Sequence, residues 1–115
     1  VVYFTGGERD MSVQKKKKPL ILDILGYKYT LIEDKEITKR GRDGECDTSA
    51  EIIYVNPELS RRAFADTLFH EVLHAVMAMG MPDKYRMTEL QVNYLGCVLT
   101  EILRRNPDLI KVLMA

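Results

Sequence analysis

An uninterrupted helical pattern over residues 61–79 constrains the fold of this chain more than any other feature. The segment contains no glycine or proline, and apolar residues recur in it at intervals of three and four. These apolar positions are Phe64, Leu68, Val72, Ala75, Val76 and Met79. Ser60 is a candidate N-cap, and Gly80 and Pro82 are stop signals. We therefore expect one long helix over residues 61–79.

Strand-like segments precede this helix. Two short runs rich in β-forming residues, 20–25 and 27–32, lie on either side of Gly26, and a third run covers 50–56. The polar segment 34–47 predicts a loop or an irregular strand connection. We therefore expect a short N-terminal β-sheet before the long helix.

A second helix is expected from Thr88 to about Arg105. Thr88 and Gln91 have the spacing of a capping box, and an apolar stripe follows them. That stripe consists of Leu95, Val98, Leu99, Ile102 and Leu103. A short last helix over 108–114 is expected next, with Pro107 at the favoured first position. Strands followed by helices predict an α+β fold.

The length of the chain fits one domain. It has 115 residues, which leaves no room for a second independent core. Residues 1–18 include four consecutive lysines, 15–18, and we interpret them as a flexible extension. Met11 stands where a native start codon could lie, so whether residues 1–10 are native stays open. We therefore predict a single domain over 19–115.

Charge and cysteine content exclude several classes of function. Seventeen basic and seventeen acidic residues give no net field for direct nucleic-acid or membrane binding. The apolar runs fall short of the roughly 20 residues that span a bilayer. Cys46 and Cys97 are too few for a disulfide framework and lack metal-pair spacing, which favours reduced thiols in a cytoplasm.

The segment His70-Glu71-Val-Leu-His74 carries the chemistry of this sequence. The chain has only two histidines, and four residues of helix place both on one face, with Glu71 on its flank. In this H-E-x-x-H arrangement two imidazoles bind zinc and the glutamate takes a proton from the metal-bound water. The alternative, two histidines that only pack, is disfavoured because they are the only two and have this spacing.

A catalytic zinc site needs a third protein ligand. No third histidine exists, so a carboxylate must supply it. Glu89 is the best candidate because an antiparallel second helix would return its first turn beside the histidines; Asp83 and Glu101 are competitors. Asn93, one turn beyond Glu89, is either a hydrogen-bond acceptor for a histidine or an ordinary surface residue.

These two segments together resemble the ImmA/IrrE family of small zinc metallopeptidases. The resemblance covers about residues 50–105 and rests on the H-E-x-x-H helix and on Glu89-Leu-Gln-Val-Asn93 after it. It implies a gluzincin-like zinc site of His70, His74 and Glu89, with Glu71 as general base. It also implies a sheet edge beside the active helix and an intracellular protein substrate, such as a DNA-binding repressor of a phage or mobile element.

Other parts of such a site are less defined by the sequence. The strand 52–56 is either a sheet edge that binds an extended peptide or an internal core strand. Groups that could stabilise an oxyanion are Tyr54, Tyr85, Arg86 and Tyr94, each of which is also an ordinary packing or surface residue.

The sequence therefore predicts a cytoplasmic zinc metallopeptidase of minimal zincin-like architecture. A protein-binding module with a structural zinc ion, or with lapsed catalysis, is the main alternative. Two further alternatives are a helical interaction domain and a nucleic-acid-associated metalloprotease of the SprT kind, which the absent third histidine disfavours.

Overall fold

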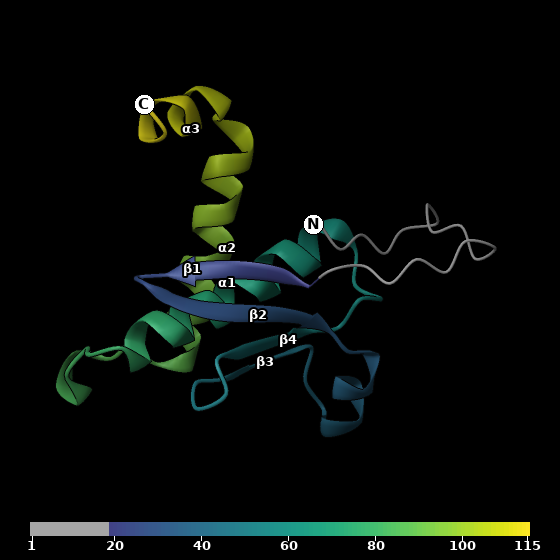
Figure 1. Cartoon of the computed structure of the whole chain (residues 1–115). Coiled ribbons are helices and arrows are strands. Elements are labelled where there is room, and N and C mark those ends of the chain that lie inside the picture. Colours follow the sequence, from purple (N-terminus) through teal and green to yellow (C-terminus); the bar gives the residue numbers. More distant parts are fainter. Residues whose placement is uncertain (1–18) are drawn as a thin grey trace.

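The computed structural model describes residues 19–115, so the extension expected at 1–18 lies outside the described residues. A four-stranded mixed sheet comes first and the helices follow, which confirms the α+β fold class (Figure 1). The strands are β1 (Leu20–Ile24), β2 (Tyr27–Glu33), β3 (Gly44–Asp47) and β4 (Ile52–Val55). The helices are η1 (Lys35–Arg40), α1 (Arg61–Ala78), η2 (Asp83–Tyr85), α2 (Glu89–Arg105) and α3 (Pro107–Leu113).

The strand order is β1-β2-β4-β3. β1 and β2 form an antiparallel hairpin around Leu25 and Gly26, which both have positive φ, as a type I′ hairpin turn requires. β2 pairs with β4 in parallel, and β3 pairs with β4 antiparallel. β4 is therefore internal, and β1 and β3 are the edges of the sheet.

The structure decides two interpretations that the sequence left open. The segment 34–47, expected to be a loop or an irregular strand connection, forms the 3₁₀ helix η1 and then the edge strand β3. Of the two alternatives for the strand 52–56, the internal core strand is the one observed, because β4 lies between β2 and β3 and its Ile53 and Val55 are fully buried. The side chain of Asp34 caps η1 by accepting a hydrogen bond from the amide of Glu36. This local capping ends β2 and turns the chain toward β3.

One face of the sheet packs against α1 and forms the core. The buried residues of this core cluster are Ile24, Tyr29, Leu31, Ile53, Val55 and Ala75. The stripe expected on α1 packs against them, since Phe64, Leu68, Val72, Val76 and Met79 are partly buried there. α1 begins after Ser60, whose hydroxyl accepts a hydrogen bond from the amide of Ala63, and it ends one residue before the expected position.

α2 packs on the side of α1 that faces away from the sheet core. The helices meet at Gly96, where an added Cβ would lie 3.8 Å from the backbone of His70, which is ordinary van der Waals spacing. The hydroxyl of Thr100 donates a 2.5 Å hydrogen bond to Oδ1 of Asp66, and Arg104 approaches the same carboxylate at 3.6 Å. These contacts join the two helices over the turns adjacent to His70.

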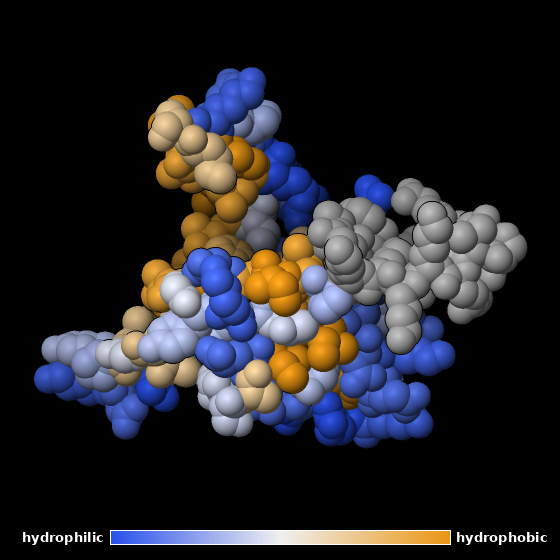
Figure 2. All heavy atoms as spheres, in the orientation of Figure 1, coloured by the Kyte–Doolittle hydropathy of each residue, from blue (hydrophilic) through white to orange (hydrophobic). Residues whose placement is uncertain are grey.

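The outer part of α2 extends beyond the sheet, with α3 folded at its end (Figure 1). Apolar side chains gather on this projection in Figure 2, among them Ile102, Leu109 and Ile110. The expectation that the stripe of α2 is buried is thus only partly met, because Ile102 is exposed and the residues buried in α2 are Val92 and Gly96. Within residues 19–115, none of the helices has the combined length and apolar character needed to cross a bilayer.

Candidate metal centre

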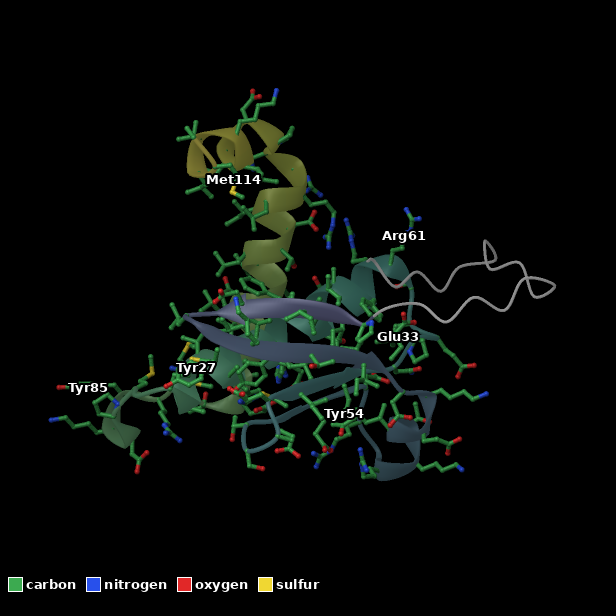
Figure 3. The ribbon with its side chains drawn as sticks, viewed as in Figure 1. Tyr27, Glu33, Tyr54, Arg61, Tyr85 and Met114 are labelled. Atoms are coloured by element: carbon green, nitrogen blue, oxygen red, sulfur yellow. The ribbon has the colours of Figure 1, made fainter. Side chains whose placement is uncertain are left out.

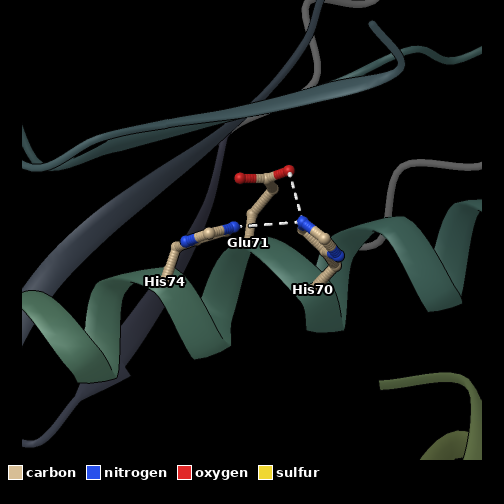
Figure 4. Close-up of side chains that lie close together, drawn as sticks. All are labelled: His70, Glu71 and His74. Carbon is tan, nitrogen blue, oxygen red and sulfur yellow. Dashed lines mark hydrogen bonds and ion pairs between the residues drawn. The ribbon is translucent and has the colours of Figure 1, made fainter. Parts of the chain in front are cut away.

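The two histidines lie on one face of α1, as the helical spacing requires. Their Nε2 atoms are 3.1 Å apart, and both side chains are largely buried. Figure 4 shows the two rings pointing toward each other from successive turns, with the carboxylate of Glu71 above them. The helix backbone therefore brings His70, Glu71 and His74 together without any help from distant parts of the chain.

Glu89 reaches the same point from α2. Its Oε1 lies 2.6 Å from Nε2 of His70, and its Oε2 lies 3.0 Å from Nε2 of His74. The capping box forms as the sequence predicts: the Thr88 hydroxyl accepts from the amide of Gln91, and the Gln91 side chain accepts from the amide of Thr88. Because this box fixes the first turn of α2, it also fixes the position of Glu89, the first residue of the helix.

The donor set fits a zinc ion. Zinc binds imidazole nitrogen and carboxylate oxygen at about 2.0–2.1 Å with tetrahedral geometry, so neighbouring ligand atoms are about 3.3 Å apart. The distances among the histidine and Glu89 atoms, 2.6, 3.0 and 3.1 Å, are close to this spacing. The residues His70, His74 and Glu89 can therefore hold one ion between them with little movement.

Glu71 has a different environment from these three residues. It is buried between α1 and β3, 7% exposed, and its Oε2 is 4.0 Å from Nε2 of His70. Burial raises the pKa of its carboxyl to about 7, with the charge of His70 acting against this rise and that of Glu89 adding to it. A carboxyl with a pKa near neutrality is suited to accept a proton and release it again.

Gly44 brings the edge strand β3 directly over Glu71. A Cβ at this position would lie 2.6 Å from Cγ2 of Thr67 and 3.0 Å from Oε2 of Glu71. The start of β3 is held by buried Asn56, whose backbone N–H donates a 2.8 Å hydrogen bond to the backbone carbonyl of Asp43. Only glycine allows this close approach of strand to helix. The strand itself was not expected, because the four residues of β3 contain no strong β-former.

Two cavities meet at the site. The larger, about 660 Å³, extends past β3 and the C-terminal turns of α1, and the smaller, about 290 Å³, extends between α1 and α2. Both are lined by Arg42, Gly44, His70, Glu71 and Glu89. Cys46 also lines the larger cavity, where burial raises its pKa to about 11, so it remains a thiol at neutral pH. The histidine pair therefore lies within a groove that continues on both sides.

The competing ligands lie elsewhere. Asp83 is exposed and pairs with Arg86 at 3.3 Å, while Glu101 pairs with Arg104 at 2.7 Å and with Arg105 at 2.5 Å. Asn93 lines the smaller cavity, but no hydrogen bond among the described residues joins it to either histidine. Of the three candidates for the third ligand, only Glu89 lies beside the histidines.

The oxyanion candidates are also separated by the structure. Tyr54 alternates along β4 with the buried Ile53 and Val55, so it faces away from α1, and Figure 3 shows Tyr85 at the tip of the segment 81–88. Tyr94 is 71% exposed on α2. Arg86 alone of the four lines a cavity at the site, and Arg42 was not among the candidates although it lines both.

Comparison of the chain with protein-family models, curated proteins and solved structures finds no match. The resemblance to the ImmA/IrrE family therefore remains a prediction that rests on the quoted motifs. The case for a function is carried by the geometry around His70 and His74.

Proposed function

We propose that this protein is a zinc-dependent metallopeptidase of the ImmA/IrrE-like, gluzincin type, which hydrolyses a peptide bond in an intracellular protein. One observation carries the proposal: two imidazoles and the Glu89 carboxylate converge within 3.1 Å while a second carboxylate, Glu71, lies buried beside them. A structural zinc site has four protein ligands, whereas a catalytic one has three and an open position. The arrangement favours the catalytic kind.

The four residues divide into two roles. His70, His74 and Glu89 would hold the ion. When bound, zinc lowers the pKa of water toward neutrality and polarises the scissile carbonyl. Glu71 accepts the proton of the attacking water and returns it to the leaving amine, which its pKa near neutrality allows at little cost. Burial under Gly44 holds the Glu71 carboxylate in place for this transfer.

A substrate chain would lie along β3. Within residues 19–115, the outer edge of this strand pairs with no other strand, and its first residue lies over Glu71. An extended peptide can add to such an edge through main-chain hydrogen bonds, which places successive peptide groups beside the histidines. The preferred substrate is an intracellular protein, by resemblance a DNA-binding repressor of a phage or mobile element, and the proposed location is the cytoplasm.

The test combines metal analysis with peptide hydrolysis. Purified protein should contain about one zinc ion per chain and cleave peptides in a proteome-derived mixture analysed by mass spectrometry. Glu71→Gln should keep the zinc and reduce turnover by about 10²- to 10⁴-fold, whereas the control Glu36→Gln, on exposed η1, should change neither. Full activity of Glu71→Gln would remove the general base from the proposal.

A zinc-loaded protein that cleaves nothing would favour the alternative, a catalytically inactive, zinc-stabilised protein-binding module. In that case zinc removal should unfold the domain or abolish partner binding, because a structural ion contributes directly to folding. A protein that binds no zinc would contradict both functions.

A further inference from the structure

The larger cavity beside the histidines contains two arginines from different parts of the chain. Arg42 precedes β3, and Arg86 lies between η2 and α2. Apart from the site carboxylates Glu71 and Glu89, the one other charged residue lining this cavity is Glu45. The cavity wall outside the proposed zinc site therefore carries two positive charges and one negative charge.

Arg86 is oriented by contacts at one end of its guanidinium. Its Nε donates to the carbonyl of Met81 at 3.2 Å and lies 3.3 Å from Oδ1 of Asp83. The side chain is 45% exposed, and the two contacts given by the structure both involve Nε. The terminal nitrogens, which form the fork that binds a carboxylate, take no part in these contacts.

Arg42 shares its acidic partner with another arginine. Nη1 of Arg42 lies 3.3 Å from Oε1 of Glu45, and Nε of Arg40 lies 3.5 Å from the same oxygen. One carboxylate thus serves two guanidinium groups, which leaves this cluster with a net positive charge. A second carboxylate entering the cavity would complete the pairing of charges.

Part of the remaining cavity wall is apolar and adaptable, although Thr48 and Cys46 also line it. Met77 is 5% exposed, and Met87 and Ala78 lie near it in the cavity lining. Methionine side chains adjust to irregular shapes, so they can accommodate the methylene groups of a bound side chain. The combination fits a group with a short apolar stem and a carboxylate end.

We propose that this cavity is the specificity pocket of the enzyme and that it selects a carboxylate of the substrate peptide close to the scissile bond, held by Arg86 and Arg42. The inference rests on the proposed function and adds the substrate class to it. The carboxylate belongs either to an aspartate or glutamate side chain or to the C-terminus of the peptide. The first makes the protein an endopeptidase that cuts near acidic residues, and the second makes it a carboxypeptidase.

Matched peptides test the selection. Cleavage of a proteome-derived mixture shows at which position relative to the scissile bond a carboxylate is preferred. Synthetic peptides then compare Glu with Gln at that position, each with a free and an amidated C-terminus. We expect about tenfold higher kcat/KM for one carboxylate, corresponding to one charge-assisted contact. A Glu preference that survives amidation identifies a side chain, and a loss on amidation identifies the C-terminus.

Variants link the preference to the cavity. Arg86→Glu should abolish the preference for the Glu peptide over the Gln peptide or reverse it in favour of Gln. Lys84→Glu makes the same charge change two residues away, outside the cavity lining, and should keep the wild-type ratio. Equal cleavage of all peptides by the wild type, or an unchanged ratio in Arg86→Glu, would overturn the inference while leaving the peptidase function intact.

Measurement of peptide binding tests the carboxylate pocket even if the protein hydrolyses no peptide. The same peptides can be titrated into the protein with and without zinc, and Arg86→Glu should remove the tighter binding of the carboxylate peptide in both states. Absence of hydrolysis with this binding preference present contradicts the peptidase and supports the pocket. Binding without preference contradicts the pocket.

Discussion

Glu71 and Glu89 approach the same two imidazoles from two regions that differ in almost every physical respect. The side chain of Glu71 is 9% exposed and lies between α1 and the edge strand β3, where a glycine is required for space. The side chain of Glu89 is 65% exposed at the first residue of α2. Two identical functional groups thus meet one histidine pair, one in a packed interior and the other at a solvent-accessible helix end.

This difference supports the two roles proposed for them, Glu71 as general base and Glu89 as zinc ligand. Removal from water raises the pKa of the Glu71 carboxyl to about 7, so this group can gain and lose a proton near neutral pH. Glu89 lies much closer to the imidazole nitrogens, at 2.6 and 3.0 Å, and is the better placed ligand. Pairs of carboxyl groups in contrasting environments are how enzymes obtain different functions from one side-chain type.

Removing the exposed carboxylate should have the largest effect. Glu89→Ala takes away one of three proposed ligands, so zinc affinity should fall by at least about 100-fold in a chelator-competition titration. Glu58→Ala, an exposed carboxylate outside both cavities, serves as control. If Glu71→Gln lost zinc while Glu89→Ala kept it, the two roles would be exchanged.

The second-largest effect is expected when a side chain is added at Gly44, beside the buried Glu71. Gly44→Ala places a methyl group within 2.6 Å of Thr67 and 3.0 Å of Glu71, so β3 must shift, and the free energy of unfolding should fall by about 2 kcal/mol. Gly96→Ala is the matched control, because its Cβ would have ordinary spacing of 3.8 Å and helical alanine is favoured over glycine. Urea unfolding measures both, and equal effects would contradict the close approach at β3.

The raised pKa predicts a pH-dependent stability of metal-free protein. A carboxyl whose pKa rises from 4.5 to about 7 on folding stabilises the fold below pH 4.5 and loses that contribution as pH rises through 7. Glu71→Gln should therefore be more stable than the wild type by about 1–2 kcal/mol at pH 8, with the difference shrinking toward pH 5. A pH-independent difference in chelator-treated samples would show that burial does not control this group.

The smallest effect is expected at the helix end that carries Glu89. Thr88→Ala removes the hydroxyl that accepts from the amide of Gln91 and should reduce the free energy of unfolding by about 1 kcal/mol. Thr88→Ser keeps the cap and should behave as the wild type. Because fraying releases Glu89, zinc affinity should fall slightly in the alanine variant alone, which a calorimetric titration can detect.

Much of the candidate site was predictable because it depends on local rules. Helical periodicity alone places His70, Glu71 and His74 together, and the Thr88–Gln91 capping box is a local signal that the structure confirms. The position of Glu89 required one further assumption, an antiparallel return of the chain, which short helix–turn–helix connections favour. The structure agrees with that assumption in the 2.6 and 3.0 Å contacts.

The sheet side was predicted less well. β3 has four residues, Gly-Glu-Cys-Asp, with no β-branched or aromatic residue, so nothing in the local sequence marks it as a strand. It forms because its partner β4 is available beside it and because Gly44 fits against α1. The same pairing moves β4 from the edge to the interior and brings Arg42 into the groove.

The sequence by itself therefore determined the α+β order, the long helix and the histidine face, because each depends on residues within a few turns of one another. Only the tertiary structure decided which strand is the edge, how deeply Glu71 is buried and which arginines reach the cavity. These features arise from pairing and packing between segments far apart in the chain, and residue spacing carries no information about the distance between such segments.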